Sequence, residues 1–81
     1  MVYTIDRSLL EKGMAEVLRV KINMLEYHLG IGSQTGLEVA VREYQQARDI
    51  ARSLLVDTLP YDEFLLRNTK ELKQRFGIEI K

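Results

Sequence analysis

The stretch from Asp6 to Leu29 restricts what this chain can fold into more than any other feature, because it has the pattern of one long amphipathic helix with a very wide apolar side. At about 100° per residue, the polar side chains form one narrow stripe, which consists of Lys12, Glu16, Arg19, Asn23 and Glu26. The apolar side chains cover about 200° of the circumference, more than one antiparallel neighbour covers. These apolar residues are Leu9, Leu10, Met14, Val17, Leu18, Val20, Ile22, Met24, Leu25, Tyr27 and Leu29.

Capping residues set the expected limits of this first helix. Asp6 or Ser8 can accept hydrogen bonds from the free amides at its start. Gly30 follows the last apolar residue, and we expect it to take the left-handed conformation that ends many helices. The first helix is therefore predicted over residues 6–29.

Two further helices are predicted downstream. The segment Thr35-Gly-Leu-Glu38 has capping-box spacing, which predicts a second helix over residues 35–59. Pro60 disfavours helical geometry at the residue before it, so the chain should turn there and form a third helix over residues 62–76 that ends at Gly77. The flanking segments 2–5 and 78–80 favour extended structure and either pair with each other, pair across a dimer or fray.

The second predicted helix carries small residues along its apolar face. Ala40, Ala47 and Ala51 would let a neighbouring backbone approach closely, and Tyr44 would interlock with a partner. Together with Val20, Met24 and Tyr27 on the first helix, these four residues are the predicted interface.

The size of the chain makes association the expected source of further burial. An 81-residue chain buries only about 60–65% of its unfolded surface. Disulfides are excluded because the chain has no Cys, and with one His we expect no metal site. A 24-residue helix spans about 36 Å, longer than the diameter of about 30 Å of a compact chain of this size. We therefore predict an all-α, rod-like helical hairpin with a shorter third helix, in a single domain that forms a homodimeric bundle.

Charge and hydropathy narrow the function classes. The 12 Lys and Arg balance the 12 Asp and Glu, so no net charge attracts the chain to nucleic acid or to an acidic membrane. No apolar run approaches the roughly 18 residues of a membrane span, and charges after Ile5 interrupt any signal-peptide core. We expect a cytoplasmic protein without a membrane partner.

Four charged residues are candidates for binding a small acidic ligand in a helical interface. Lys21 and His28 lie one heptad apart within the apolar arc of the first helix, while Glu43 and Arg48 flank the apolar face of the second. In an antiparallel hairpin, Lys21 and Glu43 come to nearly the same level and can pair. The alternative is structural: Lys21 extends its ammonium to water, and His28 interacts with the helix dipole.

The C-terminal helix is basic, with Arg67, Lys70, Lys73 and Arg75, and these residues either contact nucleic acid or form a solvated face.

No carboxylate pair or serine motif indicates catalysis, and we expect no enzyme activity and no cofactor. The leading hypothesis is a non-enzymatic interaction and oligomerisation module, with a homodimer or another protein as its partner. The alternatives are a dimeric nucleic-acid-associated regulator and a helical dimer that binds a small acidic ligand.

Overall fold

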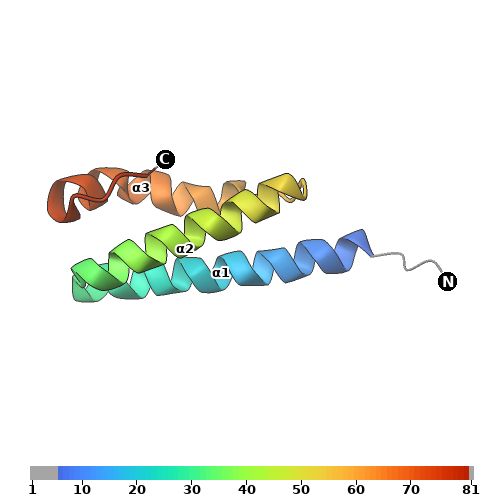
Figure 1. Ribbon diagram of the computed structural model, residues 1–81, viewed down its shortest axis with the longest axis horizontal. Helices are drawn as coiled ribbons and strands as arrows, with labels where there is room; N and C mark the ends of the chain where they lie inside the picture. The colour runs from blue at the N-terminus through green and yellow to red at the C-terminus, as the bar shows by residue number, and fades with distance from the viewer. Residues whose placement is uncertain (1–5, 81) are drawn as a thin grey trace.

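A computed structural model describes residues 6–80 and shows three helices that run along a common long axis (Figure 1). They are α1 (Arg7–Ile31), α2 (Gln34–Ser53) and α3 (Leu59–Phe76). No strand occurs in this part of the chain, which confirms the all-α prediction. The predicted extended segment 2–5 lies outside the described residues.

The turn between α1 and α2 lies two residues beyond its expected place. Asp6 caps α1 through Ser8 as predicted, but the left-handed residue is Gly32 (φ 68°), so the prediction for Gly30 was wrong. Ser33 N–H donates to the His28 carbonyl and Gly32 N–H to that of Leu29, the bonding pattern of a Schellman motif. Both glycines tolerate the left-handed conformation, and the docking of α2 selects the second.

Ser33, not Thr35, caps the start of α2. Its hydroxyl accepts a hydrogen bond of 3.2 Å from Gly36 N–H, so Thr35 already lies in the first helical turn and the predicted capping box is wrong. Gly32, which ends α1, is followed directly by Ser33, so the turn of this hairpin is very short.

The helix α2 ends at Ser53, six residues earlier than predicted. Leu55 adopts a left-handed conformation (φ 60°), and Val56 N–H donates to the Ala51 carbonyl at 2.9 Å. This turn places Val56 in the core, where it is 8% exposed. Burial of Val56 therefore ends the helix where no glycine or proline signals an end.

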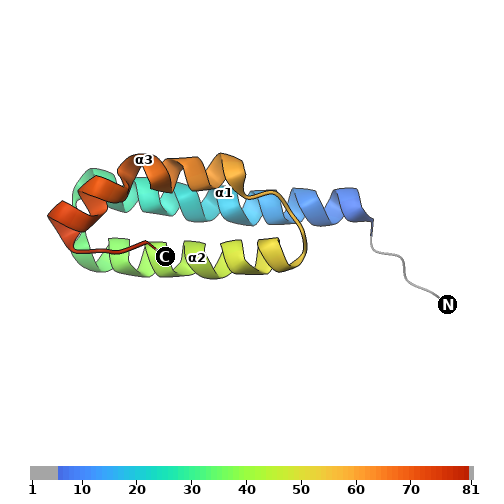
Figure 2. The same cartoon turned by 90° about the horizontal axis from the view of Figure 1, so that it is seen from above.

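The helix α3 begins at Leu59, with Pro60 in its first turn, and ends at Gly77 (φ 67°) as predicted. Its start lies three residues before the predicted one, because Pro60 tolerates helical geometry at the start of a helix, where its missing N–H is not needed. After Gly77 the chain folds back along α2 without forming a strand, as Figure 2 shows. Ile78 is buried there and Ile80 packs against the core.

The helices α1 and α2 form a closely packed antiparallel hairpin, and α2 contributes the largest share of the buried apolar side chains. The helix α3 lies over this hairpin, and both α2 and α3 occupy the same side of α1 in Figure 1. The buried apolar side chains are Leu18 and Leu25 of α1, Leu37, Ala40, Val41, Tyr44, Ala47 and Ala51 of α2, Leu65, Leu72 and Phe76 of α3, and Val56 and Ile78.

Candidate functional site

An apolar row runs along the side of α1 that faces away from the core. We call it the α1 seam, and it consists of Val17, Val20, Met24, Tyr27 and Ile31. These side chains are between 41% and 61% exposed. Their direction differs from that of Leu18 and Leu25 by roughly 130° around the helix. The seam is therefore a second apolar face of α1 that its own chain leaves uncovered.

The spacing within the α1 seam alternates between three and four residues, from Val17 to Ile31. This is the spacing of the positions through which two helices pack in a coiled coil. Other exposed apolar residues, such as Ile50 and Leu66, belong to α2 and α3, and scattered exposed apolar residues are ordinary on protein surfaces. The α1 seam is distinguished by its continuity over four helical turns.

Polar side chains border the α1 seam on both sides. Lys21 lies on the border next to α2, and its ammonium contacts the carboxylate of Glu43 at 3.3 Å. The side chains are 31% and 47% exposed, so this predicted ion pair contributes about 0–1 kcal/mol. Glu16 lies on the opposite border and pairs with Arg19.

His28 packs against α2 near the hairpin turn instead of joining the Lys21 ion pair. A Cβ atom on Gly36 would lie 2.3 Å from His28 Nδ1, so the imidazole occupies the space that a side chain would need. The ring also packs edge-on against Tyr27, with 5.2 Å between the ring centroids. Among the described residues, Nδ1 is buried and has no hydrogen-bond partner. His28 thus acts in the structure as a packing residue.

Arg48 lies on another side of the molecule from these groups. It is 8% exposed, its guanidinium lies 6.0 Å from the centre of the Tyr44 ring, and its Nε is 3.8 Å from Asp49. The structure therefore brings together two of the four predicted ligand residues, Lys21 and Glu43, and does not form one pocket from all four.

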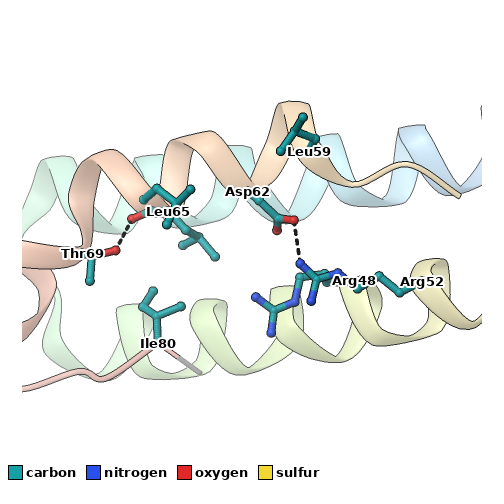
Figure 3. A pocket seen from close by; sticks show the side chains of 8 residues that line it. Arg48, Arg52, Leu59, Asp62, Leu65, Thr69 and Ile80 are labelled. Atoms are coloured by element: carbon teal, nitrogen blue, oxygen red, sulfur yellow. Dashed lines mark hydrogen bonds and ion pairs between the residues drawn. The ribbon is translucent and has the colours of Figure 1, made fainter.

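Arg48 instead lines a pocket of about 370 Å³ between α2 and α3 (Figure 3). The Asp62 side chain points from α3 towards Arg48 and Arg52 on α2, and Ile80 enters from the C-terminal segment. Apolar residues of α3 form much of the lining, namely Leu59, Leu65 and Leu66, and Thr69 completes it. The Thr69 hydroxyl already donates to the Leu65 carbonyl at 2.7 Å. The pocket thus combines a largely apolar lining with the ion pair between Asp62 and Arg52.

Asp62 is the centre of a hydrogen-bond network that ties α2 to α3. Its carboxylate accepts from the Tyr44 hydroxyl at 2.5 Å, from the Thr58 hydroxyl at 2.8 Å and from Arg52 at 2.9 Å. Burial opposes ionisation of Asp62, but these three donors and the charge of Arg52 together hold its pKa below the ordinary value. Burial, and then the hydrogen bond to Asp62, raise the pKa of Tyr44. The network therefore keeps an ionised carboxylate beside a neutral phenol.

Four of the predicted interface residues lie inside the chain. Ala40, Tyr44, Ala47 and Ala51 are at most 6% exposed, because the other helices of the same chain cover this face of α2. Val20, Met24 and Tyr27 remain exposed, so the interface prediction now rests on α1.

The basic residues of α3 do not form one compact surface. Arg67, Lys70, Lys73 and Arg75 point in different directions around the helix. Arg75 also pairs with Glu71 at 3.1 Å and stacks over the Phe76 ring. Within residues 6–80, no group of three or more potential ligand side chains is placed to hold a metal ion.

Sequence reasoning missed two features of these sites. It placed Val17 in the apolar arc of the first helix but not in the predicted interface, and it omitted Ile31, although the alternating spacing from Val17 onwards gave the signal for a separate row. It also missed the Asp62 network, for which the only signal was that a tyrosine on an apolar face needs a partner for its hydroxyl.

Comparison with known proteins gives no relative from which a function can be transferred. No family model, no curated protein and no solved structure matches this chain. In the described part of the chain, none of the helices has the length and apolar character that crossing a membrane requires.

Proposed function

We propose that this protein is a non-enzymatic helical interaction module that self-associates through the α1 seam. The observation that carries the proposal is the continuous exposed row from Val17 to Ile31 on the outer side of α1. A chain that leaves such a row open to water loses the favourable free energy of burying it, which association with another helix recovers.

The size of the row supports a specific contact. If two copies pair through the α1 seam, they bury on the order of 1,000 Å² of surface in total. This area is near the lower limit for a specific interface. The α1 seam runs from Val17 to Ile31, or about 21 Å, which is more than half the length of the 25-residue helix.

The proposal is tested by measuring the mass of the protein in solution by sedimentation equilibrium. We expect a homodimer at micromolar concentration. The variant Val20→Glu/Met24→Glu places two charges in the middle of the α1 seam, and we expect it to weaken association about 100-fold or more, because unpaired charges would be buried in the interface.

The matched control is Ile50→Glu, which puts a charge on an exposed apolar residue of α2 outside the α1 seam. It should retain the wild-type mass, and circular dichroism should show native helicity for all three proteins. A wild-type chain that stays monomeric at high micromolar concentration, or a dimer that both variants disrupt equally, contradicts the proposal.

A further inference from the structure

We infer that the α1 seam receives the α1 seam of a second copy of this chain, with the two helices parallel and in register. The inference rests on the proposed function and adds the identity and the orientation of the partner. It comes from the residues that border the α1 seam, which carry complementary groups at the spacing that a parallel pair requires.

The heptad assignment follows from the alternating spacing of the α1 seam. One of the two packing positions, called a, holds Val17, Met24 and Ile31. The other, called d, holds Val20 and Tyr27. No charged residue occupies either position between Val17 and Ile31, so two copies can pack along this length without burying a charge.

This assignment determines which residue of the partner each bordering residue meets. In a parallel two-stranded coiled coil, the residue just before an a position lies next to the partner residue five positions further along. Glu16 therefore meets Lys21 of the partner subunit, an attractive pair that occurs twice through the two-fold symmetry.

An antiparallel pair lacks this complementarity. In that arrangement each border faces the same border of the other copy, so Lys21 and His28 lie beside one another and Glu16 lies beside Asn23 or Glu16. No pair of opposite charges forms between the nearest bordering residues, and like charges approach each other. Charge pairs at the borders of coiled coils set the orientation of the partner, and here they favour the parallel one.

The existing contacts of the two charged residues leave them accessible to a partner. Lys21 and Glu16 retain side-chain exposures of 31% and 61%, respectively, beside their ion pairs with Glu43 and Arg19. In addition, α2 and α3 lie on the same side of α1 in Figure 1, and every side chain of the α1 seam is at least 41% exposed.

Single cysteines test the orientation, because the chain has no Cys of its own. In a parallel pair in register, Val20→Cys and Tyr27→Cys each face their own copy, and each variant should form a disulfide-linked dimer under mild oxidation. In an antiparallel pair, at most one of the two positions can face its own copy. The sulfur atoms of the other variant would then lie about 20 Å apart. Ile50→Cys, on α2, is the control that should not cross-link efficiently.

Charge reversal tests the register. We expect Glu16→Lys to weaken the homodimer about tenfold, because both pairs between Glu16 and Lys21 become repulsive. The complementary variant Lys21→Glu/Glu43→Gln should also weaken it. Its second substitution removes the carboxylate on α2 that would otherwise repel the new carboxylate on α1 within the same chain.

A mixture of these two variants should recover the affinity. The ammonium introduced on one chain then faces the carboxylate introduced on the other, while the unchanged Glu16 and Lys21 form the second attractive pair. We expect the dissociation constant to return to the wild-type value, and native mass spectrometry should identify the species as a heterodimer.

Glu43→Gln alone is the control and should leave the dissociation constant unchanged within about twofold. Cross-linking by only one of the two cysteine variants, or failure of the mixed variants to recover affinity, overturns the parallel arrangement while the proposed function stands. A wild-type protein that is monomeric in sedimentation equilibrium overturns both.

Discussion

At the scale of single residues, the Asp62 carboxylate shows how one polar group orients two helices. Three donors from α2 and from the connection before α3 converge on it, and each buried donor would lose a partner if the carboxylate were removed. The network thus specifies how α3 sits against α2, where apolar contact alone permits several arrangements.

This network predicts an acid-dependent stability. Because the folded pKa of Asp62 lies below the unfolded value of about 3.9, the stabilisation is complete above that pH and is lost as the pH falls through the folded pKa. At neutral pH we expect Asp62→Asn to lower the free energy of unfolding by about 1–2 kcal/mol. Urea titrations at several pH values should show the difference from wild type shrinking below about pH 4. A difference independent of pH would contradict the assignment.

Gly36 provides a prediction about close packing. Gly36→Ala gains helix propensity, but its Cβ would overlap the imidazole of His28, so we expect a net loss of about 1–3 kcal/mol in the free energy of unfolding. Gly30→Ala is the matched control, because a Cβ there meets nothing within 4 Å, and it should stabilise the protein by up to about 1 kcal/mol. Equal effects of the two variants in urea unfolding would refute the packing argument.

At the scale of elements, the end of α2 depends on contacts with a distant part of the chain. Arg7, the first residue of α1, donates to the carbonyls of Leu54 and Leu55, at 2.6 Å in each case. A guanidinium at this place satisfies carbonyls that the end of a helix leaves free and interacts favourably with the helix dipole. The early end of α2 is thus stabilised by the first residue of α1, which lies beside it at the open end of the hairpin.

The left-handed Leu55 at this end of α2 predicts an unusual stabilising substitution. Its side chain is 84% exposed, so Leu55→Gly loses little burial and relieves the unfavourable backbone conformation. We expect a gain of about 0.5–1 kcal/mol, measured by thermal or urea unfolding. Leu54→Gly, at an ordinary φ of −92°, should destabilise the protein instead. A loss of stability on Leu55→Gly would contradict this prediction. It would show that a contact of the Leu55 side chain contributes more free energy than relief of the left-handed backbone conformation.

At the scale of the whole molecule, the chain is a rod. Its extents are 53 × 18 × 16 Å and its radius of gyration is 14.3 Å, compared with about 12 Å for a compact chain of this length. A rod has more surface for its volume than a sphere, so three helices cannot cover both apolar faces of α1. This shape leaves the α1 seam open.

Association through the α1 seam predicts that thermal stability depends on concentration. A dimer that binds only in the folded state raises the melting temperature as the protein concentration increases. We expect calorimetry to show this rise for the wild type and for Ile50→Glu, and no such rise for Val20→Glu/Met24→Glu. A melting temperature that is the same at all concentrations for the wild type would argue against a folded-state dimer.

Helix positions followed from sequence where a local signal was unambiguous. Gly77 ends α3 as predicted because the apolar pattern before it stops there. Between α1 and α2, Gly30 and Gly32 are equally able to end a helix, and Ser33 and Thr35 are both able to start one. Local propensity could not choose within these pairs, since the choice depends on where the second helix packs.

Periodicity along the chain was sufficient to establish that the protein is helical and that α1 is apolar over more than half of its circumference. The short connection between α1 and α2 established that they lie antiparallel. Only tertiary packing decided which of those apolar residues the chain covers itself. Ala40 and Ala51 became core, whereas Val20 and Tyr27 stayed exposed, although both sets have the same apolar character in sequence. The physical reason is that a helical wheel gives the angle of a side chain around its own helix, while its burial depends on where the other helices lie around it.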